Sequence, residues 1–187
     1  MTHKELCELA VAWLQRPKSR NGPGCLVAVS ETANAVSREI PDAIGWRPFK
    51  HSRSGSTMVE VKTSRADFLA DAVKPHRAKP ETGLGTYRYY MAPAGVIDLD
   101  DLPPRWGLIE VSKTGRIKVR AGHVLLKYRE HDKWKHEFNQ RAEVSLLSMC
   151  LARVGNPQLV QDKIRAANNR AAKLERMLDK ARRKERQ

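Results

Sequence analysis

The sequence predicts an α/β domain with a mixed central sheet flanked by helices, followed by a basic helical extension at the C-terminus. Apolar residues at helical spacing near the N-terminus precede several short runs rich in β-branched and aromatic residues. A second helical pattern then separates two of these runs, and such alternation of helices and strands is typical of α/β folds. Residues 160–181 finally repeat apolar positions at alternating spacings of four and three, which predicts a heptad-patterned helix.

The first predicted element is an amphipathic helix. Thr2-His3-Lys4-Glu5 has the spacing of a capping box. Apolar residues follow at positions 6, 9, 10, 13 and 14, which predicts a helix of about three turns that ends before Pro17. Glu5 lies at the border of the apolar face, so this helix could lend it to a site beneath, although the capping role competes.

Short runs downstream predict the sheet. Residues 25–29 are typical of a buried strand, and residues 38–46 of a strand interrupted at Pro41. Because proline removes a ladder donor, we expect that strand at an edge or with a bulge. Ser64 begins a predicted helix that runs to about Lys74 and stops at Pro75. The remaining predicted strands are 57–63, 87–92, 106–111 and 116–119, the last two forming a hairpin.

Two of these strands carry the charged residues of the candidate site. Pro41-Asp42 lies on one, and Glu60-Val61-Lys62 on the next. Side chains alternate across a strand, so Glu60 and Lys62 share the face opposite Val61. An unpaired carboxylate or ammonium group buried there would cost several kcal/mol. A divalent metal ion held between Glu60 and a second acid would remove that cost, and Asp42 is the evident second acid.

This order of elements and these motifs resemble the PD-(D/E)XK nuclease superfamily. The matching residues are Pro41-Asp42 and Glu60-Val61-Lys62, and the resemblance covers residues 2–92. Residues 87–93 and 102–111 look like parts of the small stand-alone members found in bacteria and bacteriophages. The resemblance implies a restriction-endonuclease-like core and a metal-dependent deoxyribonuclease, with DNA repair, recombination, phage replication or defence as possible settings.

The resemblance also implies a role for each matching residue. Asp42 and Glu60 would bind Mg²⁺ or Mn²⁺, with the backbone carbonyl of Val61 as a further ligand. Two carboxylates within reach of each other repel unless a cation or a proton intervenes, and Mg²⁺ prefers a few carboxylates plus waters and phosphate oxygens. Lys62 would orient or deprotonate the attacking water, or neutralise charge that develops on the phosphate.

Two other interpretations of these charged residues also fit the sequence. Glu60 and Lys62 could form an incidental ion pair on a strand. The chain could also be a non-catalytic nucleic-acid-binding protein that keeps the fold, with the acids as fold elements only.

The charge of the chain points to a polyanionic partner. Its net charge is +14 and its pI is about 10.0, which favours nucleic acid over an anionic membrane, and the nuclease resemblance implies DNA as the partner. Lys74, Arg77, Lys79 and Arg88 could follow a phosphate backbone beside the metal site. No apolar run is long enough to span a bilayer, and the N-terminus lacks the apolar segment of a signal peptide, so we expect a cytoplasmic protein, in a bacterial cell and possibly phage-encoded.

Three residue types have simpler interpretations. Cys7, Cys25 and Cys150 are widely spaced and odd in number, which fits neither a disulfide framework nor a zinc site, so we expect small buried residues. The tyrosines at 87, 89 and 90 could stack on bases, but strand residues of this kind more often pack in a core. The five-residue spacing of His131 and His136 does not suggest a metal site.

The chain is expected to divide into a nuclease-like core at 1–125 and a helical region at 126–187. In the latter, Gly155-Asn156-Pro157 predicts a break before the heptad helix. Its alanine-rich apolar positions could pair with a second copy to form a homodimer, and its basic surface could lie along DNA. These positions are 160, 164, 167, 171, 174, 178 and 181.

Overall fold

The computed structural model describes residues 1–32, 36, 39–48 and 55–184. The chain divides into two compact units, Met1–Leu146 and Leu147–Gln187. The first unit contains a six-stranded sheet and carries the candidate site. The second is helical and is described by itself below.

One mixed sheet forms the centre of the first unit, with its strands in the order β1-β2-β3-β4-β5-β6. β1, β2 and β3 pair antiparallel, β4 pairs parallel with both β3 and β5, and β6 returns antiparallel to β5. The α/β class with a mixed sheet flanked by helices is therefore confirmed. The strands are β1 Val27–Ser30, β2 Ala43–Arg47, β3 Gly55–Val61, β4 Tyr87–Pro93, β5 Trp106–Val111 and β6 Ile117–Ala121.

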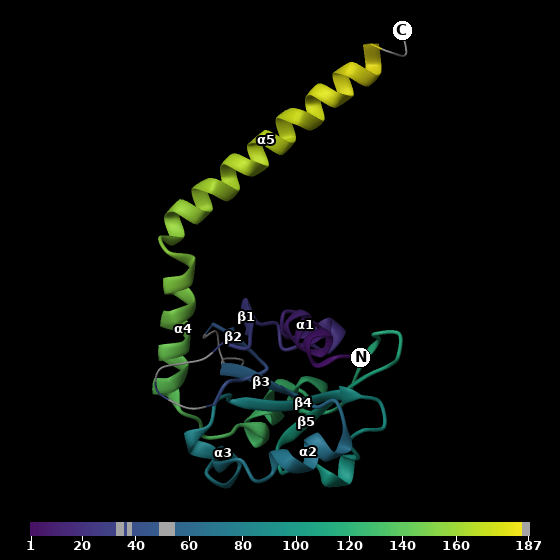
Figure 1. Cartoon of the computed structure of the whole chain (residues 1–187), viewed down its shortest axis with the longest axis vertical. Coiled ribbons are helices and arrows are strands. Elements are labelled where there is room, and N and C mark those ends of the chain that lie inside the picture. The colour runs from purple at the N-terminus through teal and green to yellow at the C-terminus, as the bar shows by residue number, and fades with distance from the viewer. Residues whose placement is uncertain (33–35, 37–38, 49–54, 185–187) are drawn as a thin grey trace. The chain divides into compact units, whose positions relative to one another are not determined.

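Helices cover both faces of this sheet. α1 (His3–Leu14) packs on one face, while α2 (Arg65–Asp71) and α3 (Pro75–Ala78) lie on the other (Figure 1). α2 and α3 occupy the connection between β3 and β4, because parallel neighbours need a long crossover. Short 3₁₀ helices complete the connections: η1 Lys18–Arg20, η3 Pro80–Thr82, η4 Leu99–Asp101, η5 His123–Leu125 and η6 Tyr128–Trp134.

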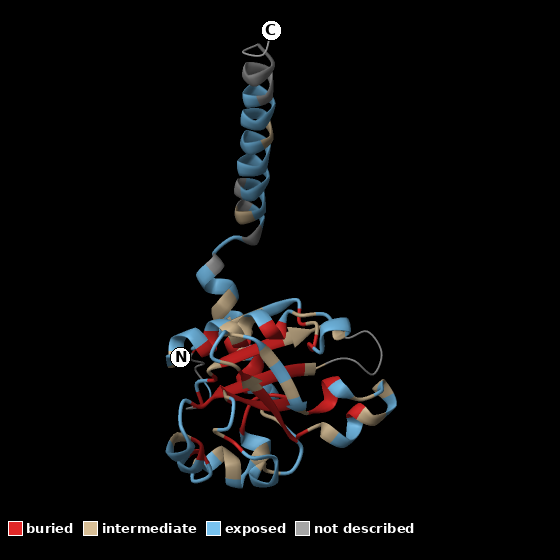
Figure 2. Cartoon of the chain, turned by 90° about the vertical axis from the view of Figure 1, so that its right-hand side faces the viewer, coloured by how far each residue is buried: buried red, intermediate tan, exposed pale blue. Residues whose placement is uncertain are grey.

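The main apolar core lies between α1 and the sheet. Leu6 and Trp13 of α1 are fully buried in one cluster with Val59 and Val61 of β3. The ring of Trp13 lies 4.9 Å from that of Tyr89 on β4. Buried residues concentrate along the central strands (Figure 2). The alternation expected for residues 57–63 therefore holds, because the two valines face α1.

The first two strands differ from the expectation. The strand expected to be buried at 25–29 is the edge strand β1, so Leu26 and Val27 are exposed. The strand expected over 38–46 begins only at Ala43, while residue 38 lies outside the described part of the chain. β2 is an interior strand, so the expected edge position is wrong. Pro41 precedes the ladder and removes no donor from it.

The expected domain boundary after residue 125 falls instead after Leu146. The first residues of α4 (Gln140–Val154) belong to the sheet unit. The Glu143 carboxylate is buried and accepts hydrogen bonds from Trp46 Nε1 at 3.1 Å, Ser56 Oγ at 2.7 Å and Gly85 N at 2.8 Å. These bonds join the start of α4 to β2, β3 and the turn before β4.

The second unit contains the rest of α4 and the helix α5 (Pro157–Lys184). The break expected at Gly155 separates the two helices, and Gly155 has a φ of 73°. Heptad residues Ile164, Leu174 and Leu178 are more than half exposed. No helix of the described ranges has the length and apolar character needed to cross a membrane.

Candidate metal-binding active site

Asp42 and Glu60 face each other across neighbouring strands. Ala43 of β2 pairs with Val59 of β3 in an antiparallel register, so one step further places Asp42 opposite Glu60. The backbone N–H of Val61 donates to Asp42 Oδ2 at 2.7 Å, which fixes that carboxylate against the end of β3. The structure therefore brings together two acids that are 18 residues apart in the sequence.

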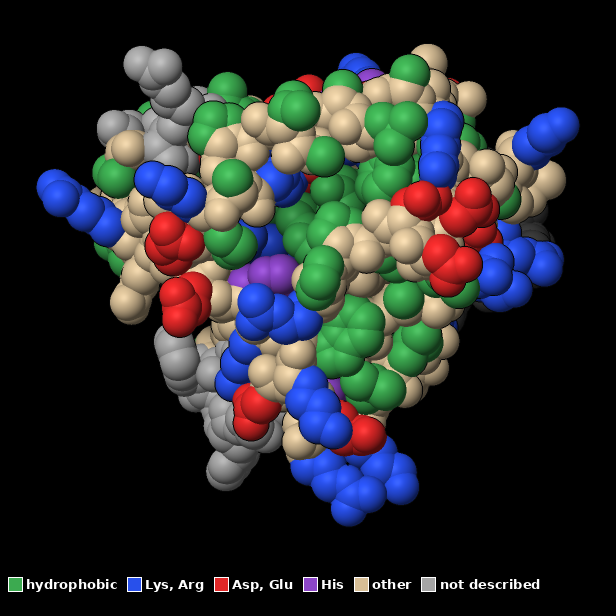
Figure 3. Space-filling view, turned by 90° about the horizontal axis from the view of Figure 1, so that it is seen from below, with side chains coloured by type: hydrophobic (Ala, Val, Ile, Leu, Met, Phe, Trp, Pro, Cys, Tyr) green, Lys and Arg blue, Asp and Glu red, His purple; other side chains and the backbone are tan. Residues whose placement is uncertain are grey.

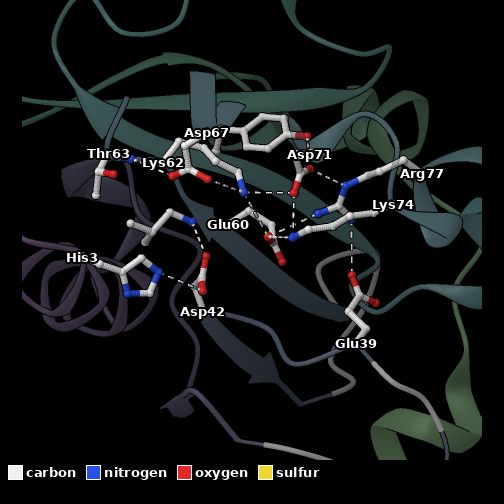
Figure 4. A network of polar contacts seen from close by, with 12 residues as sticks. His3, Glu39, Asp42, Glu60, Lys62, Thr63, Asp67, Asp71, Lys74 and Arg77 are labelled. Carbon is white, nitrogen blue, oxygen red and sulfur yellow. Dashed lines mark hydrogen bonds and ion pairs between the residues drawn. The ribbon is translucent and has the colours of Figure 1, made fainter. Parts of the chain in front are cut away.

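Lys62, the residue after β3, lies beside these two acids. Glu60 and Lys62 lie on the face of the sheet opposite Val59 and Val61, and Lys62 Nζ is 3.7 Å from Glu60 Oε2. Both side chains are buried, with exposed fractions of 2% for Glu60 and 4% for Lys62. Figure 4 shows Glu60 and Lys62 joined in one network of polar contacts, while Asp42 beside them contacts His3 and the backbone N–H of Val61.

A third acid, Asp71 at the end of α2, is the centre of this network. Its carboxylate lies 2.9 Å from Lys62 Nζ, 2.7 Å from Lys74 Nζ and 2.6 Å from Arg77 Nε. The hydroxyl of Tyr90 donates to it at 2.7 Å. Burial alone would raise the pKa of Asp71, but these donors, Arg77 first, hold that pKa well below its usual range.

Glu60 is compensated on one oxygen only. Lys74 Nζ is 3.1 Å from its Oε2 and Arg77 Nη2 is 3.3 Å from the same atom. The other oxygen, Oε1, is buried and has no hydrogen-bond partner among the described residues. Ion pairs thus supply positive charge at Oε2, while Oε1 is left able to accept a further ligand.

Asp42 has fewer donors than Asp71. Burial raises its pKa, and the negative charge of Glu60 raises it further, against the hydrogen bond from Val61. Its Oδ1 lies 3.2 Å from Nε2 of His3, at the start of α1. The side chain of Asp42 keeps an exposed fraction of 19%, so solvent and ions reach it.

α1 contributes His3 rather than Glu5. Glu5 is exposed, and its carboxylate accepts from the Thr2 backbone N–H at 2.7 Å in the expected capping box. Of the two roles left open for Glu5, the structure shows the capping role. The helix geometry explains this, because His3 and Cys7 are one turn apart on the side that meets Asp42. The capping pattern alone gave no signal for His3.

The residues present fit an oxygen-preferring divalent cation. Glu60 Oε1, which has no donor within the described ranges, and the carboxylate of Asp42, whose pKa is raised, are hard oxygen ligands of the type that Mg²⁺ prefers. The charge of Glu60 still raises the pKa of Asp42, although cations lie at Glu60 Oε2, so a cation beside Asp42 would balance the remaining negative charge.

Arg88, one of the basic residues expected to contact nucleic acid, is buried. It has an exposed fraction of 2%, and its guanidinium donates to the carbonyl oxygens of Gly85, Pro80 and Glu137. The expectation for Arg88 is therefore wrong, since those backbone acceptors hold the side chain inside the protein.

The other three candidates differ in access. Arg77 has a side-chain exposed fraction of only 7% and serves the ion-pair network. Lys74 keeps 40% of its side chain exposed while its Nζ reaches Glu60 and Asp71. Lys79 is exposed. Lys74 and Lys79 are thus the residues of this set that a phosphate backbone could contact.

Hollows adjoin the network on the side of α2 and α3. One, of about 310 Å³, is lined by Phe68, Tyr90 and Trp106 together with Arg77, whose guanidinium lies 4.6 Å from the Trp106 ring. Figure 3 shows hydrophobic side chains around a hollow on this face, with basic side chains at its edge. A second groove, of about 670 Å³, is bordered by Glu39, Ile40, Lys74, Pro75, His76, Thr82, Asn139 and Val36.

The tyrosines of β4 pack inside the protein, which confirms the interpretation favoured from the sequence. Tyr87 stacks on His123 with ring centres 3.7 Å apart, and Tyr90 stacks on Trp106 at 4.3 Å. Tyr89 is buried beneath α1. Base stacking by these three tyrosines is therefore wrong, because none of their rings is exposed.

No protein-family model matches the chain, and no curated protein does. Among solved structures, a protein of unknown function from Silicibacter pomeroyi is similar in fold, with a TM-score of 0.53 and 17% sequence identity. The match covers 87% of this chain and 93% of that one. At this identity the likeness concerns the fold alone.

Proposed function

We propose that the chain is a small metal-dependent nuclease that hydrolyses phosphodiester bonds in DNA. The observation that carries the proposal is the position of Asp42 opposite Glu60, with Lys62 Nζ 3.7 Å from Glu60 and one Glu60 oxygen without a donor in the described part of the chain. The order α1, β1, β2, β3, α2, α3, β4 supports the resemblance to PD-(D/E)XK nucleases, because the motif residues fall at the ends of β2 and β3.

Asp42 and Glu60 would hold Mg²⁺ or Mn²⁺, and the carbonyl of Val61 would be the further ligand that the resemblance implies. Such an ion lowers the pKa of a bound water and stabilises charge on the phosphate. The N–H of Val61 keeps Asp42 oriented toward Glu60. Asp71 holds the Lys62 ammonium at 2.9 Å, which places that charge beside Glu60, where it can orient the attacking water or balance the phosphate.

DNA is the proposed substrate because the net charge of +14 favours polyanions. Lys74 and Lys79 would contact the backbone near the site, and such contacts make binding weaken as salt rises. α5 adds nine basic and three acidic side chains. It would bind DNA or pair with a second copy through its apolar positions, and sedimentation velocity on the full chain would show a monomer if the pairing is wrong.

Cleavage of supercoiled and linear DNA in the presence of Mg²⁺ tests the proposal. We expect Asp42→Asn and Lys62→Ala each to lower the cleavage rate by at least about 100-fold, the lower range for loss of a positioned catalytic group. Asp100→Asn and Lys118→Ala are matched controls, because both residues are exposed and lie outside the network. Thermal melts of each variant would separate loss of chemistry from loss of fold. A wild type that cuts nothing, or variants that cut as fast as the controls, would overturn the proposal.

A non-catalytic nucleic-acid-binding protein is the second candidate, and the ion-pair network favours it. Lys62, Lys74 and Arg77 all lie within 3.7 Å of Glu60 Oε2, so this acid has a structural role without a metal. Titration with Mn²⁺ distinguishes the two. Binding that is lost in Glu60→Gln supports the nuclease, while DNA binding without any Mn²⁺ site supports the second candidate.

A further inference from the structure

A second group of potential metal ligands lies beside the candidate active site. His3 and Cys7 are one turn apart on α1, and Asp42 precedes β2. One ligand atom from each lies within 4.8 Å of the others. Cys7 Sγ is 3.5 Å from His3 Nδ1 and 4.0 Å from His3 Nε2, and that Nε2 is 3.2 Å from Asp42 Oδ1.

We propose that His3, Cys7 and Asp42 bind a transition-metal ion of the Zn²⁺ class. The donor set is one imidazole nitrogen, one thiolate sulfur and one carboxylate oxygen. Thiolate and imidazole select zinc-like ions over Mg²⁺, which prefers oxygen alone. This ligand chemistry differs from that of the Asp42–Glu60 pair, although the two sites share one carboxylate.

The interatomic distances suit tetrahedral coordination. Bond lengths of about 2.3 Å to sulfur and about 2.0 Å to nitrogen and oxygen at the tetrahedral angle place S and N about 3.5 Å apart, and N and O about 3.3 Å apart. The observed separations from His3 Nε2 are 4.0 Å to Cys7 Sγ and 3.2 Å to Asp42 Oδ1. Cys7 Sγ would move about 0.5 Å toward His3 Nε2 to reach the tetrahedral separation, and it lies within 4.8 Å of the ligand oxygen of Asp42.

A carboxylate lies near the His3 ring, and the side chain of His3 is exposed enough for an ion to reach it from solvent. With Nε2 as the ligand atom, the other ring nitrogen, Nδ1, lies 4.0 Å from Glu31 Oε1. This separation is longer than a hydrogen bond, so Glu31 acts on the ring through its negative charge, which favours a cation bound to the imidazole. The side chain of His3 has an exposed fraction of 43%, so an ion enters from solvent, and water would complete the coordination as in open zinc sites.

The charge around Cys7 also favours a cation. Burial raises the pKa of this thiol to about 12, and the negative charges of Asp42 and Glu31 add to the rise. Without an ion the thiol therefore stays neutral. When an Sγ–metal bond forms, the S–H proton passes to solvent, and the cation offsets the neighbouring carboxylates.

Cobalt absorption provides a direct test, measured on the full chain without DNA or Mg²⁺. We expect one equivalent of Co²⁺ to produce the charge-transfer absorption of a cobalt–thiolate bond and the visible bands of a tetrahedral ion, and Zn²⁺ to displace it. Cys7→Ser should abolish the charge-transfer absorption. His3→Gln should weaken Co²⁺ affinity at least about tenfold, as loss of a ligand or its orienting partner does.

Cys150→Ser is the matched control, because Cys150 is a partly exposed cysteine on α4 outside this cluster. It should keep the full signal. His3 is half-exposed, so His3→Gln also tests the site in case Cys7→Ser fails to fold. Absence of cobalt–thiolate absorption in the wild type, its survival in Cys7→Ser, or its loss in Cys150→Ser would each overturn the assignment.

One consequence rests on the proposed function. An ion at His3 and Cys7 engages the carboxylate of Asp42 that the nuclease site needs, so Zn²⁺ should slow Mg²⁺-dependent cleavage in the wild type and less so in His3→Gln. The cobalt spectrum requires no cleavage, and failure of the nuclease proposal would leave it unchanged.

Discussion

Asp71 and Asp42 are two carboxylates beside Glu60 with opposite surroundings. Asp71 is buried and receives three cationic side chains and a tyrosine hydroxyl, which hold its pKa low. Among the residues that the structure describes, Asp42 has one backbone donor and one histidine, and burial with the charge of Glu60 raises its pKa. The contrast indicates that Asp71 organises the fold locally, while Asp42 is the acid able to exchange its partners for a ligand.

Replacing Asp71 should have the largest effect on stability. Asp71→Asn removes the shortest ion pair of both Lys62 and Arg77, at 2.9 Å and 2.6 Å, and leaves these buried cations with longer contacts such as those to Glu60. Breaking a buried ion pair from one side costs about 3–5 kcal/mol. Urea denaturation measures the free energy of unfolding, with exposed Asp100→Asn as the control. If both variants unfold at the same urea concentration, Asp71 does not have this structural role.

Removing the hydroxyl of Tyr90 should have the next largest effect on stability. Tyr90→Phe removes a hydrogen bond of 2.7 Å to the charged Asp71, and such bonds contribute about 1.5–3 kcal/mol. Tyr87→Phe is the matched control on the same strand. The Tyr87 hydroxyl is buried with no hydrogen-bond partner among the described residues, so its removal should leave stability unchanged or raise it slightly. Equal losses in the two variants would contradict the importance of the Asp71 network.

Asp42→Asn should have the smallest effect on stability. Unlike Asp71→Asn and Tyr90→Phe, it should stabilise the protein. Because the folded-state pKa of Asp42 is raised, its carboxyl contributes less stability as pH rises from about 3.9, the ordinary value, through the folded pKa. In metal-free buffer Asp42→Asn should therefore gain stability relative to the wild type across that window, by up to about 1 kcal/mol.

Denaturation curves at a series of pH values between 3 and 8, with roughly equal spacing, measure this difference. Asp71→Asn should show the reverse slope, since the low folded-state pKa of Asp71 stabilises the protein above the ordinary pKa and that stability is lost as pH falls. Parallel pH profiles for the two variants would remove the distinction between the acids.

Much of the candidate site was predictable because it lies along two strands. Alternation put Glu60 and Lys62 on one face, and the structure keeps them 3.7 Å apart. The spacer after Asp42 suited a hairpin, and the register places that acid opposite Glu60. The sequence did not predict Asp71 as part of the site, because Asp71 lies at an ordinary helix end. Nothing local showed that the side chain of Asp71 points toward Lys62.

The same limit explains Arg88 and Cys7. A basic residue between tyrosines suggests a phosphate contact, but three backbone carbonyls hold Arg88 inside the protein. A single cysteine on a helix suggests a small buried residue, which Cys7 is. Only the approach of Asp42 to α1 brings Cys7 and His3 near a third ligand.

The sequence by itself determined the α/β class, the capped first helix, the hairpin of β5 and β6 and the placing of Glu60 opposite the core valines. These follow from periodicity and capping, which act over a few neighbouring residues. The tertiary structure alone decided which acids receive cations, which arginines are buried and which residue of α1 reaches Asp42. Those outcomes depend on desolvation and charge between segments far apart in the chain, and both are set only when the elements pack together.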